Sequence, residues 1–213
     1  MYTGRVCYQG GYFSIFSTHT NHASNQYIMK TLYTPEKSGA FVVHGNITLI
    51  SGQHNATYQK MHALIVELAL AGPVKVLIGG NLYDHYGINY ALAAATSHYE
   101  YILDTHIRLS RAETCYQMVE LLNQTPADQT PSLVLDLLAP FHDESVPERE
   151  IDQLLFEAIL ELRRLNQRAK VVVSAYPGKN RPRLLTVLEN VFDQIEQPRV
   201  LPLQPILQQA LIG

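Results

Sequence analysis

Short apolar runs alternate with longer amphipathic stretches along most of the chain from residue 45 onward. The runs at 46–51, 74–78, 132–138 and 170–175 have the length of buried strands. Between them, apolar residues recur at the three- and four-residue spacing of helices that cover a sheet. Strands that alternate with helices in this way predict a parallel sheet with right-handed crossovers.

Further elements follow from the same pattern and from capping signals. We expect strands within 101–109 and at 200–203. We expect helices at 60–71, near 88–95, behind residue 112, at 151–165, from Pro182 through Ile195, and at 205–212. Ser110 and Glu113 have the spacing of a capping box, which predicts that a helix starts at Ser110.

The fold class that this order favours is α/β, with three layers and a mainly parallel central sheet. Runs such as 133–135 and 171–173 are apolar throughout, which is typical of strands buried on both faces. We interpret 41–213 as one domain and 1–40 as an N-terminal extension packed on it. Within that extension, 12–17 alternates weakly and is read as an edge strand or a hairpin arm.

Ligands of parallel sheets lie beyond the carboxyl ends of the strands. The pattern therefore predicts one functional rim, formed by the segments 52–58, 79–86, 136–143 and 175–183.

The first rim segment follows a strand and precedes a helix, which is the setting of a phosphate-binding loop. Gly52 supplies the first glycine of the G-x-x-x-x-G-K-[ST] pattern. Thr57, Tyr58 and Gln59 then stand where the second glycine, the lysine and the magnesium-binding hydroxyl belong. The candidate nucleotide-site residues, vestigial or atypical, are Gly52, Gln53, His54, Asn55, Ala56, Thr57, Tyr58, Gln59 and Asp136.

Asp136 ends an apolar strand, where a carboxylate is placed to hold magnesium through water. A carboxylate that caps a neighbouring helix or pairs with a base is an equal alternative. In the second rim segment, Asn81 or Asp84 could polarise a water molecule, but a helix N-cap is the favoured role for Asp84.

The last rim segment carries three positive charges, which are the candidate nucleic-acid contacts Lys179, Arg181 and Arg183. A solvated basic loop is the alternative. The formal net charge of −3 supplies no global basic field for nucleic-acid binding.

Composition argues against a disulfide framework, a metal site and a membrane span. Two cysteines are too few for a disulfide framework, and Cys115 lies on an apolar helix face that predicts a core position. The nine histidines include the close pair His19 and His22 but form no metal-binding spacing, so we interpret them as scattered loop residues and expect no metal site. No apolar run reaches the length of a membrane span and no signal peptide is evident, so the expected location is cytoplasmic and off the membrane.

Four segments, at 45–52, 76–84, 107–117 and 133–136, occur in an order that resembles the RecA/KaiC-type P-loop ATPases, including recombinases and their paralogues. The similarity covers about residues 44–200, and 108–117 is its most specific part. The resemblance implies a RecA-like fold. It does not imply the activity, because the lysine and the hydroxyl of the phosphate loop are absent.

The resemblance therefore favours a non-catalytic, recombinase-paralogue-like protein with no cofactor. It would act by assembling with itself or with a RecA-like paralogue, with contact to DNA in recombination or repair. One alternative is an ATP-binding protein or ATPase that uses Asp136, Lys60 and the loop backbone with ATP and magnesium. Another is a scaffold without a ligand. In the favoured case, Tyr58 is predicted to fill the position of the β-phosphate.

Overall fold

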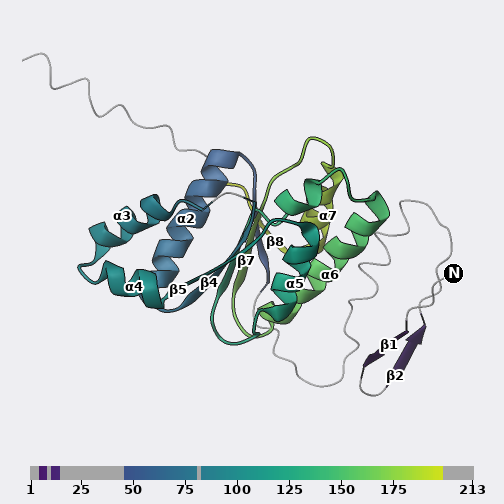
Figure 1. Cartoon of the computed structure of the whole chain (residues 1–213), viewed down its shortest axis with the longest axis horizontal. Helices are drawn as coiled ribbons and strands as arrows, with labels where there is room; N and C mark the ends of the chain where they lie inside the picture. Colours follow the sequence, from purple (N-terminus) through teal and green to yellow (C-terminus); the bar gives the residue numbers. More distant parts are fainter. Residues whose placement is uncertain (1–4, 9–10, 15–45, 81–82, 199–213) are drawn as a thin grey trace, which may run out of the picture. The chain divides into compact units, whose positions relative to one another are not determined.

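The computed structural model describes residues 5–8, 11–14, 46–80 and 83–198 (Figure 1). The chain divides into two compact units, Met1–Ala40 and Phe41–Gly213. In the first unit, β1 (Arg5–Tyr8) pairs antiparallel with β2 (Gly11–Ser14). The weak alternation at 12–17 thus falls partly on the second arm of a hairpin.

The second unit is built on a parallel sheet in the order β5-β4-β6-β7-β3-β8. The strands in that order are β5 (Ile107–Ala112), β4 (Val74–Gly79), β6 (Ser132–Leu135), β7 (Val171–Ala175), β3 (Thr48–Ser51) and β8 (Gln194–Glu196). Every pairing in this sheet is parallel, which requires crossover connections between consecutive strands. The face of the sheet on which each crossover helix packs sets the direction in which the loop before it leaves the strand.

Helices cover both faces of the sheet (Figure 1). One face carries α2 (His54–Ala71), α3 (His85–Ala95) and α4 (Tyr99–Thr105), and the other carries α5 (Cys115–Gln124), α6 (Glu148–Asn166) and α7 (Arg183–Val191). A short 3-10 helix, η1 (Ala139–His142), follows β6. The expected three-layer α/β/α architecture is confirmed.

Two apolar clusters, one on each face, hold the layers together. The first includes Met61 and Ile65 of α2 against Val76 of β4, and the second includes Leu155 of α6 against Val173 of β7. The inner strands β4, β6 and β7 are buried along their whole length, as their continuous apolar sequences predict. Each fully buried aliphatic side chain stabilises the fold by roughly 1.5–3 kcal/mol, so the strand ends are held firmly in place.

The predicted capping box is wrong. Ser110 lies inside β5, opposite Leu77 of β4, because the backbone pairing continues through Ala112. The helix therefore starts later, and Thr114 is its N-cap, with a side chain that accepts a hydrogen bond from the Gln117 N–H. Tertiary strand pairing outweighs the local capping preference at Ser110.

Several predicted boundaries also move. The helix predicted at 60–71 begins at His54, and the strand predicted at 132–138 ends at Leu135. Part of 101–109 is helical, and the last helix stops at Val191, so that Ile195 lies in β8. The elements predicted at 200–203 and 205–212 lie outside the described residues.

Candidate functional site

Neighbouring strands send the chain toward opposite faces at three places on the carboxyl edge, between β5 and β4, between β4 and β6, and between β7 and β3. The connections after β3 and β4 lead to α2 and α3 on one face, and those after β6 and β7 lead to η1, α6 and α7 on the other (Figure 1). β4 neighbours β6 and β7 neighbours β3, and the points where the chain diverges beside such pairs are where open α/β sheets have their ligand crevices. The candidate site is this edge, which brings together the four predicted rim segments.

The turn between β3 and α2 is shorter than a phosphate loop. Gly52 has φ of +134°, and α2 begins two residues later at His54. Residues 54–59 were predicted as part of a loop, but they form the first turns of the helix, because Gln53 to Gln59 include no glycine that would let the backbone wrap around an anion. The helix start itself is open: Gln53 makes no side-chain cap, and the first turn carries no acidic residue.

The three residues at the positions of the missing phosphate-loop groups have different surroundings. Thr57 is fully buried, and among the described residues its Oγ1 has no hydrogen-bond partner. Gln59 is exposed, as are Gln53, His54 and Asn55, whereas Ala56 is buried. Tyr58 is half-buried on the side of α2 that faces α3, and burial raises the pKa of its hydroxyl, with a further contribution from the charge of Asp84.

Asp136 stands at the centre of the edge, immediately after β6. Its backbone is left-handed, with φ of +50°, which ends the strand, and its N–H donates to Ser174 Oγ at 2.9 Å. Burial raises the pKa of its carboxyl to about 7, partly opposed by the backbone of Ala139. The desolvated carboxyl therefore holds its proton to a higher pH than an exposed aspartate does.

Two glycines at the end of β4 make room for Asp136. A Cβ at Gly79 would come within 2.4 Å of the Asp136 carbonyl oxygen. Gly80 has φ of +84°, and a Cβ there would come within 2.8 Å of the Ala139 Cβ. The glycine pair, which the sequence suggested as a place of close backbone approach, serves this packing between β4 and the loop after β6.

Tyr176 lies directly after β7 and contacts the start of α2. Its hydroxyl donates to the His54 carbonyl at 3.4 Å, and its ring stacks on the His54 ring with centroids 4.6 Å apart. Burial, then the charge of Asp136, then Tyr58 raise the pKa of the Tyr176 hydroxyl. Tyr176 thus joins the β7 and β3 sides of the edge through contacts that the sequence analysis did not foresee.

Seven rings follow one another along the edge from β7 to α3. We call this set the ring row; its members in order are Tyr176, His54, Tyr58, His62, Tyr83, His85 and Tyr86. Neighbouring centroids lie 4.0–6.4 Å apart. His54, Tyr58 and His62 share one face of α2 because they are four residues apart. That spacing was the available signal. The interpretation of the histidines as scattered loop residues is wrong for His54 and His62, which lie in α2, and for His85, which begins α3.

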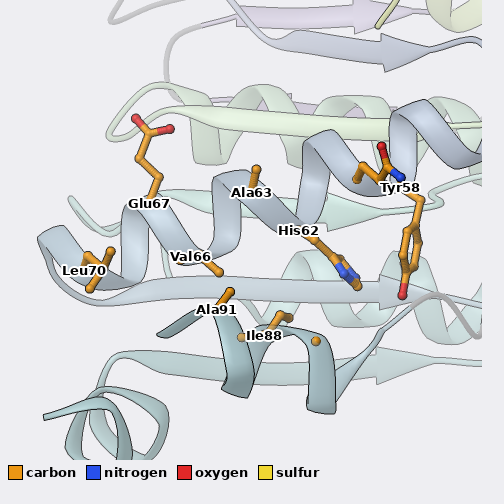
Figure 2. Close-up of a pocket in the computed structure, with 10 residues that line it drawn as sticks. Tyr58, His62, Ala63, Val66, Glu67, Leu70, Ile88 and Ala91 are labelled. Carbon is orange, nitrogen blue, oxygen red and sulfur yellow. The ribbon is translucent and has the colours of Figure 1, made fainter. Parts of the chain in front are cut away.

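A groove of about 580 Å³ runs between α2 and α3 beside the ring row (Figure 2). Figure 2 shows Tyr58 and His62 projecting from α2 side by side, with Val66 and Leu70 further along the helix. The far wall is formed by Ile88 and Ala91 of α3. The groove surface is mainly apolar, and Gln59, His62 and Glu67 are the polar residues that line it besides Tyr58.

Asp84 has the role that the sequence favoured for it. Its side chain accepts from the Gly87 N–H at 2.9 Å and caps α3, which confirms the helix N-cap. Asn81, the other residue proposed to polarise water, lies outside the described residues, as do His19 and His22.

The basic loop does not present three free charges. Arg181 is buried and donates to the carbonyls of Phe141, Asp143 and Val146 at 2.6–2.8 Å. Arg183 is half-buried and pairs with Glu148 and Asp152. Only Lys179 is exposed among the three predicted nucleic-acid contacts, so Arg181 is corrected to a structural residue that ties this loop to the segment after η1.

Cys115 lies in the core, as predicted, and burial raises the pKa of its thiol. His142 is half-buried and packs against Gly178, and burial lowers the pKa of its imidazole. Within the described parts of the chain, no cluster of three or more His, Cys, Asp or Glu side chains has the arrangement of a metal site.

Comparisons with known proteins add no family. A scan against protein-family models finds no match, and a search of curated proteins finds none. Among the helices of residues 46–80 and 83–198, none has the length and apolar character needed to span a bilayer.

Proposed function

We propose that this chain is a non-catalytic, RecA-like protein with a degenerate nucleotide site, which acts by assembling with itself or with a RecA-like paralogue in DNA recombination or repair. The observation that carries the proposal is the β3–α2 connection. It has the strand, glycine turn and helix of a phosphate-binding site, but it is two residues long, and Tyr58 and Gln59 follow instead of lysine and a hydroxyl.

The state of Asp136 supports the same proposal. In an active ATPase of this type, the aspartate at the end of its strand holds magnesium through water and must be ionised. Here the carboxyl is desolvated and its pKa is about 7, so binding a divalent cation would first require the loss of a proton. Lys60, the cation nearest in sequence, pairs with Glu196 at 3.7 Å, with both side chains partly exposed.

Within this proposal, DNA contact has less support from the described residues than assembly with a protein partner. Lys179 is exposed, but Arg181 and Arg183 already bind carbonyl and carboxylate oxygens of the same chain. One lysine supplies little counterion release, so the contribution of this loop to affinity for a phosphate backbone is small. Assembly with a protein partner is accordingly the main activity that we propose.

A nucleotide-binding protein is the alternative, and one feature favours it. The N-terminus of α2 has neither a capping side chain nor an acidic residue, so its N–H groups and dipole are available to an anion. The orphaned Thr57 Oγ1, close to this turn, would be satisfied if a ligand or water reached it.

Titration calorimetry with ATP and magnesium separates the two. We expect no heat of binding at micromolar ATP, together with a mass above that of one chain in size-exclusion chromatography with light scattering. Micromolar affinity for ATP would overturn the degenerate-site proposal. A strictly monomeric chain that also retains no RecA-like partner would leave the ligand-free scaffold as the better description.

The variant Thr57→Gly, Tyr58→Lys, Gln59→Thr restores the residues of the phosphate loop. Because Thr57 is fully buried inside α2, glycine there removes packing and weakens the helix, and we expect a loss of about 1–3 kcal/mol with no gain in ATP binding. Calorimetry of the variant beside its melting curve tests this, with Tyr58→Lys alone as the control. A gain of ATP binding would show that only the missing groups, and not the shape of the turn, disable the site.

A further inference from the structure

Two ring pairs, one stacked and one tilted at 45°, lie at the start of α2. On one side, Tyr176 stacks on His54 with centroids 4.6 Å apart, and on the other, Tyr58 lies against His62 at 4.0 Å. The inner rings of the two pairs, His54 and Tyr58, are nearly parallel, with an interplanar angle of 9° and centroids 6.4 Å apart. His54 is exposed and Tyr58 is half-buried, so both rings can be reached from solvent.

The separation of the inner rings is close to that of two rings with a third between them. Aromatic faces in van der Waals contact lie about 3.5 Å apart, so an inserted ring needs about 7 Å. The observed 6.4 Å is short of this by an amount that small side-chain rotations can supply. The outer rings hold His54 and Tyr58 from behind, which reduces the conformational entropy lost when a ligand enters.

The charges around the rings select against a phosphorylated ligand. Asp84 is near enough to Tyr58, and Asp136 near enough to Tyr176, for each carboxylate to raise the pKa of the neighbouring phenol. Lys60, on the same helix, is paired with Glu196. The exposed amides of Asn55 and Gln59 lie on the same turns of α2 and can bond to the polar edge of a heterocycle.

We propose that His54 and Tyr58 form a stacking site for a planar, uncharged heteroaromatic ring, such as the base of a nucleoside without phosphates. The ring would lie between the faces of His54 and Tyr58, with Tyr176 stacked on the other side of His54. This site is separate from the proposed assembly function: it uses ring faces, and it requires neither the helix N-terminus as an anion site nor magnesium.

Adenosine is the probe, and binding is measured by titration calorimetry with the full chain. We expect saturable binding that Tyr58→Leu and His54→Ala each weaken by about fivefold or more, because stacking on one aromatic side chain contributes that much per base. Tyr58→Phe keeps the ring and is expected to bind like the unmodified protein. Tyr90→Leu is the matched control, because Tyr90 is 76% exposed on α3 and lies outside the ring row.

Each of the other outcomes contradicts either the stacking site or the proposal of a degenerate nucleotide site. Absence of adenosine binding at millimolar concentration overturns the site, and so does binding that Tyr58→Leu and His54→Ala leave unchanged in variants whose melting curves match the unmodified protein. A loss in Tyr58→Phe equal to that in Tyr58→Leu would assign the effect to the hydroxyl and also overturn it. Magnesium-dependent ATP binding much tighter than adenosine binding would instead overturn the degenerate nucleotide site.

Discussion

At the scale of single residues, Asp136 has the least ordinary environment among the described side chains at the carboxyl edge. Its left-handed backbone ends β6, its N–H is held by Ser174, and two glycines of β4 pack against its loop. The carboxyl has a pKa of about 7, against an ordinary value of 3.8. A group with such a shift changes the stability of the fold with pH.

We predict that the buried carboxyl of Asp136 makes the unmodified protein less stable as pH rises. The variant Asp136→Asn should not show this decrease. Between about pH 4 and 7, the folded carboxyl keeps its proton while the unfolded one loses it, so the free energy of unfolding falls through this window. Asparagine stays neutral and tolerates the left-handed backbone. The stability of the variant relative to the unmodified protein should therefore rise from pH 4 to pH 8, by up to about 4 kcal/mol.

Urea unfolding at both pH values measures this difference. Asp104→Asn is the control, because it makes the same substitution at an exposed aspartate. If the difference between Asp136→Asn and the unmodified protein did not change with pH, the carboxyl would be ionised in the folded state.

Arg181, which the sequence suggested as a nucleic-acid contact, has a structural role. Its guanidinium donates to three backbone carbonyls and also pairs with Glu148. We predict that Arg181→Ala lowers the free energy of unfolding by about 2–4 kcal/mol, because buried carbonyls lose their donors. Arg183→Ala, at a more exposed ion pair, should cost about 1 kcal/mol or less. Equal urea midpoints for the two variants would contradict this assignment.

At the scale of elements, the start of α5 tests whether strand pairing or local capping decides a boundary. Thr114 caps the helix, whereas Ser110, which has the better local capping sequence, is an exposed residue of β5. We predict that Thr114→Ala destabilises the fold by about 1 kcal/mol and that Ser110→Ala changes stability by less than about 0.5 kcal/mol. A larger loss of stability for Ser110→Ala than for Thr114→Ala, measured by thermal melting, would instead support a helix cap at Ser110.

The α2 helix illustrates an element whose type is readable from sequence but whose start is not. Its apolar positions at 61, 65 and 69 recur every four residues and pack on the sheet, so a helix here was predictable. Its first six residues carry polar and aromatic side chains that resemble a loop in sequence. They are helical because nothing between Gln53 and Gln59 breaks a helix, and Ala56 and Thr57 are buried by the fold.

At the scale of the whole molecule, the described apolar core belongs to one of the two compact units. The described members of both apolar clusters lie between Ile47 and Phe192, inside the unit Phe41–Gly213. We predict that a chain starting at Phe41 unfolds in one cooperative transition, with Tm within about 4 °C of the full chain, because its core is complete. Calorimetric melting of both chains measures this, and a broad transition of the shorter chain would show that residues 1–40 are part of the folding unit.

What the sequence by itself determined is the architecture and the location of the site. Apolar runs of strand length separated by amphipathic helices allow few arrangements other than a covered parallel sheet, and parallel strands bring their carboxyl ends to one edge. The N-cap at Asp84 and the core position of Cys115 were readable because each depends on neighbours a few residues away. The RecA-like kinship and the assembly function stay predictions.

Only the tertiary structure decided the chemistry of that edge. Tyr176 meets His54 from 122 residues away, and Arg181 reaches a carbonyl 40 residues distant, so no local pattern could reveal that one completes a ring row and the other is buried. The proton affinity of Asp136 likewise depends on burial by loops from neighbouring strands. Local periodicity sets which elements form, whereas solvation and partners, which set what a polar side chain can do, depend on contacts between distant parts of the chain.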